Sequence, residues 1–131
     1  MPVRIAIVGS RRLPEDARRV IFAGVAGTPI DAIIVSGGAR GPRTSPRART
    51  VSADREARRA AEFYRREFDE MLADWDDVGP RAGFERNERL VASLTGPEDR
   101  LVAIWDGVSQ GTRHVMSIAL SVGRLHKVIR Y

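Results

Sequence analysis

The sequence predicts one Rossmann-like α/β domain, with a mainly parallel five-stranded sheet in the order 3-2-1-4-5 and helices on both faces. Short β-branched apolar runs alternate along the chain with longer segments of helical periodicity, a pattern typical of parallel βαβ units. The 131 residues are about the length of one domain, and we find no internal repeat. Residues 1–131 are therefore interpreted as a single domain.

The first elements are indicated by apolar runs and turn residues. VRIAIV at 3–8 ends at a glycine, which predicts a buried strand followed by a turn. PED at 14–16 predicts a helix start, because proline is tolerated in the first turn and acids are favoured at the positive end of the helix dipole. This helix should run to about Gly27, and DAIIVSGG at 31–38 predicts the second strand and its turn. The helix is expected to bury Ala17, Val20, Ile21 and Val25.

The middle of the chain carries two more helical segments around a weak strand. ADREARRAAEFYRRE at 53–67 is helical, and FDEML at 68–72 is a partly acidic third strand. GFERNERLVASL at 83–94 is the next helix. The apolar face of the first helix is Ala57, Ala60, Ala61 and Tyr64, and the second should turn Phe84, Leu90, Val91 and Leu94 inward.

The C-terminal part predicts strand, helix and strand. LVAIW at 101–105 is a buried strand that places Trp105 in the core, and KVIRY at 127–131 is the last strand. Between them, the helix at 109–123 is almost wholly apolar after His114, so we expect most of its circumference to be covered. That apolar helix and the exposed edges of a small sheet favour a homodimer.

The composition limits the classes of function. The chain has no cysteine, which excludes disulfides and thiolate metal sites, and His114 and His126 are its only histidines, so no metal is expected. The N-terminal apolar run of about six residues is too short for a signal peptide or a membrane span. We therefore expect a soluble, cytoplasmic protein without membrane contact. The net charge of +5, carried almost wholly by arginine, suits anionic partners, although arginine usage fits a GC-rich genome equally well.

Ligands of open parallel sheets bind at the carboxyl ends of the strands, where the strand order reverses. The predicted turns at those ends are GSRR, SGGARG, ADWDDVG and DGVSQGT. Glycine permits close backbone approach, and the N–H groups of a following helix favour an anion. The first turn lacks G-x-G-x-x-G, the second strand ends in SGG instead of a ribose-binding acid, and no G-x-x-x-x-G-K-[ST] loop exists. An ordinary NAD site and a P-loop ATPase are therefore disfavoured. For each glycine turn taken alone, the alternative to ligand binding is a purely structural role in the turn.

The same turns carry motifs of a known family. These are GSR at 9–11, SGGARG at 36–41, ADW at 73–75, AGFERN at 82–87 and DGVSQGTRH at 106–114. In this order they resemble the YspA/YpsA-related branch of the SLOG superfamily, which includes the LOG phosphoribohydrolases and the DprA/Smf DNA-processing proteins. The resemblance covers nearly the whole chain except 42–53.

This resemblance implies a Rossmann-like sheet that holds a nucleotide or nucleotide-derived ligand as its small-molecule partner. The residues implied to line that site are Gly9, Ser10, Arg11, Ser36, Gly37, Gly38, Arg40, Arg86, Asn87, Asp106, Gly107, Ser109, Gly111 and Thr112. Arg86 and Asn87 fall where the LOG enzymes have an Arg-Lys pair. Asn87 is also an unfavourable helix residue without a local reason, which favours a role in the site. The alternative to ligand contact for the arginines at these turns is a solvated position on the protein surface. The alternative for Ser109 and Thr112 is that they only cap the helix that follows.

One departure from the LOG pattern bears on catalysis. The LOG enzymes carry an acidic pair after the Gly-Thr, whereas here Gly111-Thr112 is followed by Arg113, His114 and Val115. Cleavage of an N-glycosidic bond passes through an oxocarbenium-like state that a nearby carboxylate stabilises. The candidate catalytic residues that remain are Arg86, His114, Asp106 and Glu85. The alternative to catalysis for His114 is a structural position near the terminus of its helix.

Three functions follow from these features. The first is a binding module for a nucleotide-type ligand, such as a sensor in a phage or conflict setting. The second is a phosphoribohydrolase that cleaves nucleoside 5′-monophosphates. The third is single-stranded nucleic-acid binding, which the arginines favour and the scarcity of aromatics opposes. Trp75, in the ADW turn, could stack on a base or cover the sheet edge.

The segment 42–53 is a basic insertion that the resemblance does not explain. It is rich in Arg, Ser, Thr and Pro, a composition typical of a mobile surface loop, and its deletion is expected to leave the fold intact. The alternative is a lid over the predicted site that carries Arg43, Arg47 and Arg49.

Overall fold

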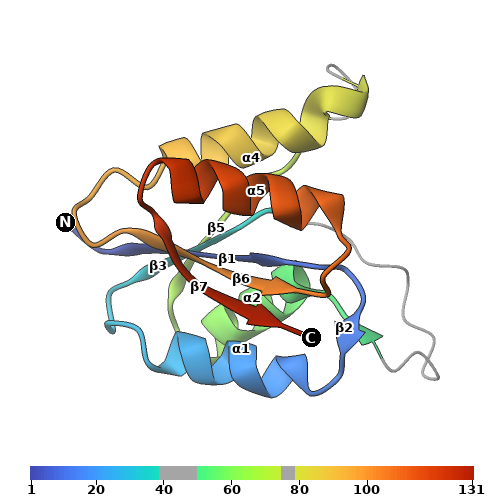
Figure 1. The fold of residues 1–131 in the computed structure, drawn as a ribbon. Coiled ribbons are helices and arrows are strands. Elements are labelled where there is room, and N and C mark those ends of the chain that lie inside the picture. The colour runs from blue at the N-terminus through green and yellow to red at the C-terminus, as the bar shows by residue number, and fades with distance from the viewer. Residues whose placement is uncertain (39–49, 75–78) are drawn as a thin grey trace.

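The fold is a five-stranded parallel sheet between two layers of helices, seen in a computed structural model that describes residues 1–38, 50–74 and 79–131 (Figure 1). The sheet order is β5-β3-β1-β6-β7. Its strands are β1 (Arg4–Gly9), β3 (Ile33–Ser36), β5 (Glu67–Glu70), β6 (Arg100–Trp105) and β7 (Leu125–Arg130). This confirms the predicted α/β class and the order 3-2-1-4-5, and places the switch point between β1 and β6.

The central strand β1 pairs in parallel with β3 along one edge and β6 along the other, and both of its faces are buried. Ile5 and Ile7 pack into one hydrophobic cluster, and Ala6 and Val8 into another on the opposite face. This alternation is the period of two of a strand, and it explains why VRIAIV is continuously apolar.

Two helices cover each face of the sheet (Figure 1). The first pair is α1 (Ala17–Ala26) and α2 (Ala53–Phe63), and the second pair is α4 (Ala82–Ala92) and α5 (Gln110–Ser121), with a 3-10 turn, η1 (Gly79–Arg81), before α4. The predicted face of α2 is buried at Ala57, Ala60 and Ala61. In α4, Leu90 and Val91 are buried, and Leu94 is buried just beyond it.

The start of α1 differs from the prediction. Pro14 lies in β2 (Leu13–Pro14), a short strand that pairs antiparallel with β4 (Thr50–Val51), and the helix begins three residues later at Ala17. Proline suits a short edge strand as well as a first helical turn, so the sequence alone could not separate the two. Val20 is half-buried, although we expected it in the core.

The end of the basic segment 42–53 belongs to the folded core. Val51 and Ala53 are buried, and the Ala53 N–H donates to the Ser10 carbonyl at 3.1 Å. The expectation that deleting 42–53 leaves the fold intact is therefore wrong at its C-terminal end. Arg43, Arg47 and Arg49, on which the lid alternative depends, lie outside the described residues.

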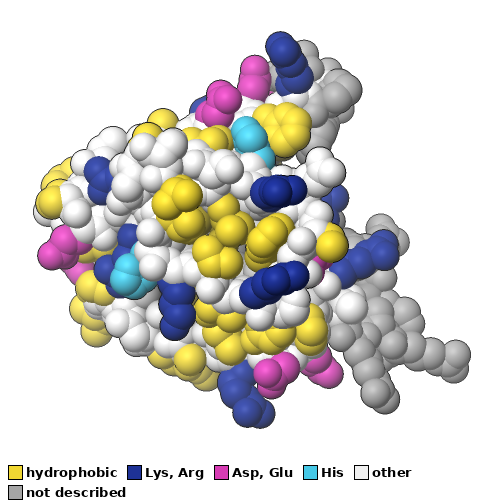
Figure 2. All heavy atoms as spheres, in the orientation of Figure 1, with side chains coloured by type: hydrophobic (Ala, Val, Ile, Leu, Met, Phe, Trp, Pro, Cys, Tyr) yellow, Lys and Arg dark blue, Asp and Glu magenta, His cyan; other side chains and the backbone are white. Residues whose placement is uncertain are grey.

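Several apolar side chains are more exposed than predicted. Phe84 is 47% exposed, and Leu120 in the last turn of α5 and Val122 just after it are 67% and 57% exposed, so the C-terminal end of that helix is not covered as predicted. A helix on a sheet needs only one apolar stripe. Trp105 is half-buried instead of in the core. Hydrophobic side chains are visible in several places on the face drawn in Figure 2. The homodimer stays a prediction.

Among the residues placed by the structure, no helix is both long and apolar enough to cross a membrane.

Candidate functional site

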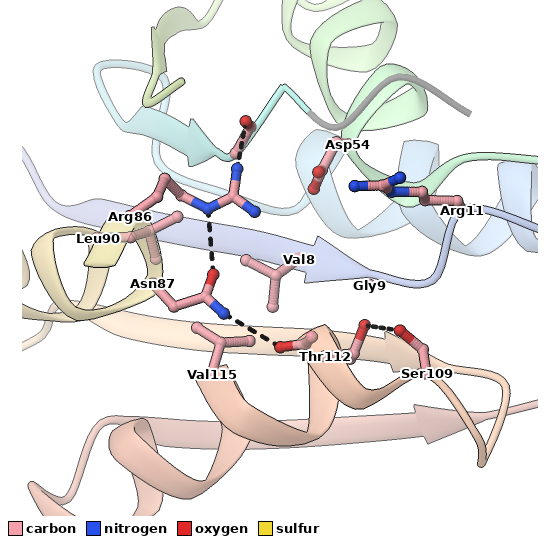
Figure 3. A pocket seen from close by; sticks show the side chains of 12 residues that line it. Val8, Gly9, Arg11, Asp54, Arg86, Asn87, Leu90, Ser109, Thr112 and Val115 are labelled. Carbon is pink, nitrogen blue, oxygen red and sulfur yellow. Dashed lines mark hydrogen bonds between the residues drawn. The ribbon is translucent and has the colours of Figure 1, made fainter. Parts of the chain in front are cut away.

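A small pocket lies at the carboxyl end of β1, where five elements converge (Figure 3). Its volume is about 70 Å³. The lining residues are Val8, Gly9, Arg11, Gly37, Asp54, Arg86, Asn87, Leu90, Ser109, Gly111, Thr112 and Val115. They come from β1 and the loop after it, the end of β3, the first turn of α2, α4, and the first turns of α5. This is the switch point at which an open parallel sheet binds ligands.

Arg86 reaches the pocket from α4 in a fixed position. Its Nη1 donates to the Gly37 carbonyl at 2.6 Å and to the Met71 carbonyl at 3.4 Å, and its Nε donates to Asn87 Oδ1 at 3.1 Å. These acceptors come from the ends of β3 and β5 and from α4 itself. The guanidinium therefore ties α4 to the sheet edge and presents its charge to the pocket.

The pKa of Arg86 is set by its burial and by the charges around it. Burial lowers the pKa of Arg86, Asp54 raises it, and the nearby Arg11 and Arg89 lower it further, so the pKa lies below its ordinary value. An arginine so shifted is still protonated at neutral pH. The pocket therefore offers two guanidinium charges against the one carboxylate among its lining residues.

Gly9 is a glycine because of packing, since a Cβ there would collide with the Ile104 backbone carbonyl oxygen. A Cβ on Gly37 would meet the Arg86 guanidinium, which would have to move from its present position. Gly111 differs, since a Cβ there would meet no atom within 4 Å. The space beside Gly111 is thus open to a ligand that approaches the start of α5.

Asn87 connects α4 to α5 across the pocket. It is 5% exposed, its Oδ1 accepts from Arg86, and its Nδ2 therefore faces the Gly111 carbonyl at 3.1 Å and His114 Nδ1 at 3.2 Å. Because Nδ2 is the donor, His114 Nδ1 is the acceptor in this pair. These bonds explain an asparagine in the middle of a helix. They also orient its amide beside the pocket.

His114 stands behind this network and does not line the pocket. Its ring packs against Phe84 in a tilted arrangement, with a centroid distance of 4.4 Å, so that apolar side chain has a partner although it is exposed. The histidine is therefore a helix-surface residue that contacts the site through Asn87.

The N-terminus of α5 faces the pocket without a side-chain cap. Ser109 is the N-cap residue, but its Oγ lies 3.1 Å from Thr112 Oγ1 and makes no capping bond to the helix backbone. The first N–H groups of a helix have no intrahelical acceptor and carry the positive end of its dipole. This arrangement favours an anion at Ser109, Gly111 and Thr112.

Asp106 stabilises the turn that leads into α5. Its Oδ1 accepts from the N–H groups of Val108 at 2.9 Å and Ser109 at 2.8 Å, and its own N–H donates to Ser10 Oγ at 3.0 Å. Burial raises the pKa of Asp106, but hydrogen bonds to its carboxylate from the Val108 and Ser109 N–H groups and from the Ser10 side chain outweigh this effect, so the pKa of the carboxyl lies below its ordinary value. Asp106 shapes the loop and is not among the lining residues.

Asp54 is the polar lining residue that the sequence analysis did not predict, and the other unpredicted lining residues, Val8, Leu90 and Val115, are apolar. Asp54 stands in the first turn of α2 and is 5% exposed, and the Ser36 hydroxyl donates to its Oδ1 at 2.7 Å. Figure 3 shows it between Arg86 and Arg11, which are on α4 and the loop after β1. An acid near a helix start is commonly a dipole partner, and only the tertiary fold turns this one toward the pocket.

Arg11 is the exposed cation of the site. It lies directly after β1, and among residues that the structure describes it makes no hydrogen bond or ion pair. Its guanidinium is therefore available to a ligand without loss of an existing bond.

The structure divides the predicted site residues into two groups. Those that line the pocket are Gly9, Arg11, Gly37, Arg86, Asn87, Ser109, Gly111 and Thr112. Those placed beside it are Ser10, Ser36, Gly38, Asp106 and Gly107, while Glu85 is exposed on α4. Ser10 and Ser36 are fully buried and hold neighbouring strands together, and Gly38 and Gly107 take positive φ at turns. Arg40 and Trp75 lie outside the described residues.

Within residues 1–38, 50–74 and 79–131, no group of three or more His, Cys, Asp or Glu side chains is placed to hold a metal ion. A family-model scan, a search of curated proteins and a search of solved structures each gave no match.

Proposed function

We propose that this protein binds a nucleotide or nucleotide-derived ligand whose phosphorylated ribose enters the pocket. The observation that carries the proposal is the convergence of Arg11, Arg86 and the uncapped start of α5 on one small space. Guanidinium groups and helix N-termini are the standard partners of phosphate. These groups also lie at the switch point of a parallel sheet, which is the usual location of a nucleotide site.

The size of the pocket limits which part of the ligand is enclosed. About 70 Å³ is roughly five times the space that one buried water requires. A phosphoryl group and part of a sugar fit in such a volume, and a purine base does not fit beside them. The rest of the ligand therefore extends toward solvent.

We also propose that the chain belongs to the SLOG superfamily. The motifs that resemble the YspA/YpsA-related branch contribute most of the polar lining: GSR gives Arg11, SGGARG gives Gly37, AGFERN gives Arg86 and Asn87, and DGVSQGT gives Ser109, Gly111 and Thr112. Motifs far apart in the sequence thus meet in one pocket, as a shared ligand site requires.

A second candidate function is cleavage of the N-glycosidic bond of a nucleoside 5′-monophosphate. The observation that favours it is Asp54, which brings a carboxylate to the pocket although the acidic pair of the LOG enzymes is missing. A carboxylate there would stabilise the oxocarbenium-like transition state. Asp106 and Glu85 do not line the pocket and are poorer candidates for this role.

Ligand screening by thermal shift, followed by product analysis, tests both functions. Nucleoside monophosphates, ADP-ribose and NAD-derived compounds are each added to the protein, and a ligand that binds only the folded state raises its melting temperature. We expect a shift with at least one phosphorylated ribose compound and no release of free base on chromatography. Release of base that Asp54→Asn abolishes would establish the second function. If no phosphorylated ribose compound shifts the melting temperature, the proposed function is wrong.

A further inference from the structure

A second cavity, beside α1, lies outside the candidate site. Its volume is about 460 Å³, and it is bounded by α1, β1 and the last two strands of the sheet, β6 and β7. Half-buried Val20, Val102 and Ile129 line it. Its deepest lining residues are buried isoleucines of one hydrophobic cluster, Ile5, Ile7, Ile21 and Ile104.

Small residues of α1 leave room for this cavity. Ala23 and Gly24 line it and are exposed, and a Cβ added to Gly24 would meet no atom within 4 Å. Figure 2 shows hydrophobic side chains on the face that β7 and α1 form, with basic side chains beside them. The cavity therefore opens toward solvent while its isoleucines stay buried.

Basic side chains gather at one end of the cavity. Arg100, His126 and Lys127 line it, and no Asp or Glu is among the described residues that do so. Arg100 and Lys127 stand in the first halves of β6 and β7, whereas Ile104 and Ile129 pair with each other farther along. The basic end therefore lies at the amino ends of the strands, opposite to the candidate site, and the other end is apolar.

These basic groups have no partner in the part of the chain that the structure describes. The side chains of Arg100, His126 and Lys127 make no hydrogen bond or ion pair with any residue of 1–38, 50–74 and 79–131. An anion at this end of the cavity would displace no existing bond. Charge-assisted hydrogen bonds to guanidinium and ammonium groups would hold it.

The volume of the cavity favours a small molecule over a protein segment. A helix with its side chains is about 10–12 Å wide, so two turns of it occupy roughly 1,000 Å³. That is more than twice the volume of about 460 Å³ that is present. Pockets for small ligands typically have volumes of about 300–1,000 Å³.

The strands set the length of the ligand. From Arg100 to Ile104, β6 rises by about 13 Å, at about 3.3 Å per residue. With carbon–carbon bonds of about 1.5 Å, an extended alkyl chain of roughly eight to ten carbons and its head group span this length. The chain would lie over the isoleucines, where its contact with water is lost.

The geometry points to a binding site for a medium-chain carboxylate in the cavity beside α1. The alkyl chain packs on Ile5, Ile7 and Ile104, and the carboxylate contacts Arg100 and Lys127 at the amino ends of the strands. This site is separate from the pocket at the end of β1 and does not depend on the proposed function.

Isothermal titration calorimetry with three probes of equal chain length tests this inference. Octanoate, 1-octanol and octyltrimethylammonium are titrated into the wild-type protein at concentrations at which each is monomeric. Octanoate should bind about tenfold or more tightly than 1-octanol, the effect of a charge-assisted hydrogen bond, and the cationic probe should bind most weakly. Equal or tighter binding of the neutral or cationic probe, or no binding of octanoate at millimolar concentration, would overturn the inference.

Variants at the basic end locate the site. The double variant Arg100→Gln, Lys127→Gln should bind octanoate and 1-octanol with affinities that agree within about twofold, because both charges are lost. The matched control is Arg130→Gln, which removes an exposed cation of β7 that does not line the cavity and should keep the wild-type preference. A folded double variant that still prefers octanoate as strongly as the wild type would also overturn the inference.

A second copy of the chain is the competing occupant of this cavity. Sedimentation of the wild type and of Ile129→Glu distinguishes it, since a charge in the apolar part of the cavity would break a dimer formed there. A wild-type dimer that binds no octanoate and that Ile129→Glu converts to a monomer would overturn the inference in favour of that interface.

Discussion

The two arginines of the pocket differ in what holds them. Arg86 is half-buried and bonded to Gly37, Met71 and Asn87, so it serves the fold and the site together. Arg11 is exposed and makes no hydrogen bond or ion pair to any residue in the described ranges, so no such bond is lost when it is replaced. Stability and ligand affinity should therefore respond differently to their replacement.

Arg11→Gln should change the free energy of unfolding by no more than about 0.5 kcal/mol but weaken phosphate-ligand binding about tenfold or more. Arg86→Gln should lower stability by about 1–3 kcal/mol as well, because the Gly37 carbonyl and Asn87 Oδ1 lose their donor. Urea unfolding and calorimetry measure the two quantities. Arg12→Gln is the control, since Arg12 is exposed next to Arg11 but does not line the pocket. Equal binding losses in Arg11→Gln and Arg12→Gln would contradict the assignment.

The glycines of the pocket give a second contrast. Gly111→Ala should keep or raise stability, because its Cβ meets open space and alanine is the better helix former, but it should weaken ligand binding. Gly9→Ala should destabilise the protein severely, because its Cβ would collide with the Ile104 carbonyl oxygen. Thermal unfolding with and without ligand separates the two effects. If Gly111→Ala binds ligand as well as wild type, the backbone there does not contact the ligand.

The pKa of Asp106 predicts how stability depends on pH. Its pKa is depressed in the folded state, so the carboxylate contributes stability above its unfolded pKa of about 3.9, and this stability is lost as the pH falls through the folded pKa. Asp106→Asn should therefore be less stable than wild type at pH 7, and the difference should narrow at pH 3. Urea unfolding at both pH values measures it. A difference of equal size at both would show that the charge of Asp106 contributes nothing.

At the scale of elements, α2 is positioned by the short β2–β4 ribbon. Val51 is buried opposite Leu13, and Ala53, one residue before Asp54, bonds to the Ser10 carbonyl. The ribbon thereby holds the start of α2 against the end of β1. The position of Asp54 in the pocket depends on this anchor.

Val51→Ala should lower the free energy of unfolding by about 2 kcal/mol, since it removes two buried methyl groups and leaves a cavity. Thr50→Ala, in the same strand but only half-buried, should cost about 0.5 kcal/mol. Chemical denaturation of the two variants gives the comparison. Equal losses would mean that Val51 is not a core residue.

The sequence could predict the strands because local patterns encode them, and their order followed from the Rossmann-like class that the alternation of strands and helices indicates. The alternation of apolar runs with helical periodicity identified each strand of the sheet, and glycines marked the turns at its carboxyl edge. The start of α1 was missed because Pro14 suits two kinds of element. Asp54 was missed because its role arises from a contact with Ser36, eighteen positions away, which no local pattern encodes.

At the scale of the molecule, the location of the site depends on topology more than on cavity size. A larger cavity of about 460 Å³ lies between α1 and the β6–β7 edge, but aliphatic side chains make up most of its lining. The smaller pocket at the switch point has the convergent charges that a phosphate requires. The net charge of +5 also allows nucleic-acid binding, for which affinity would fall steeply with salt.

The most direct test of the central claim is to map ribose 5-phosphate binding by NMR on the isotope-labelled protein. We predict saturable shifts of the backbone amides of Gly37, Gly111 and Thr112 and of the Asn87 side-chain amide, with little effect at the cavity beside α1. Shifts confined to that other cavity, or no shifts at millimolar ligand, would contradict the claim that the pocket at the end of β1 binds phosphorylated ribose.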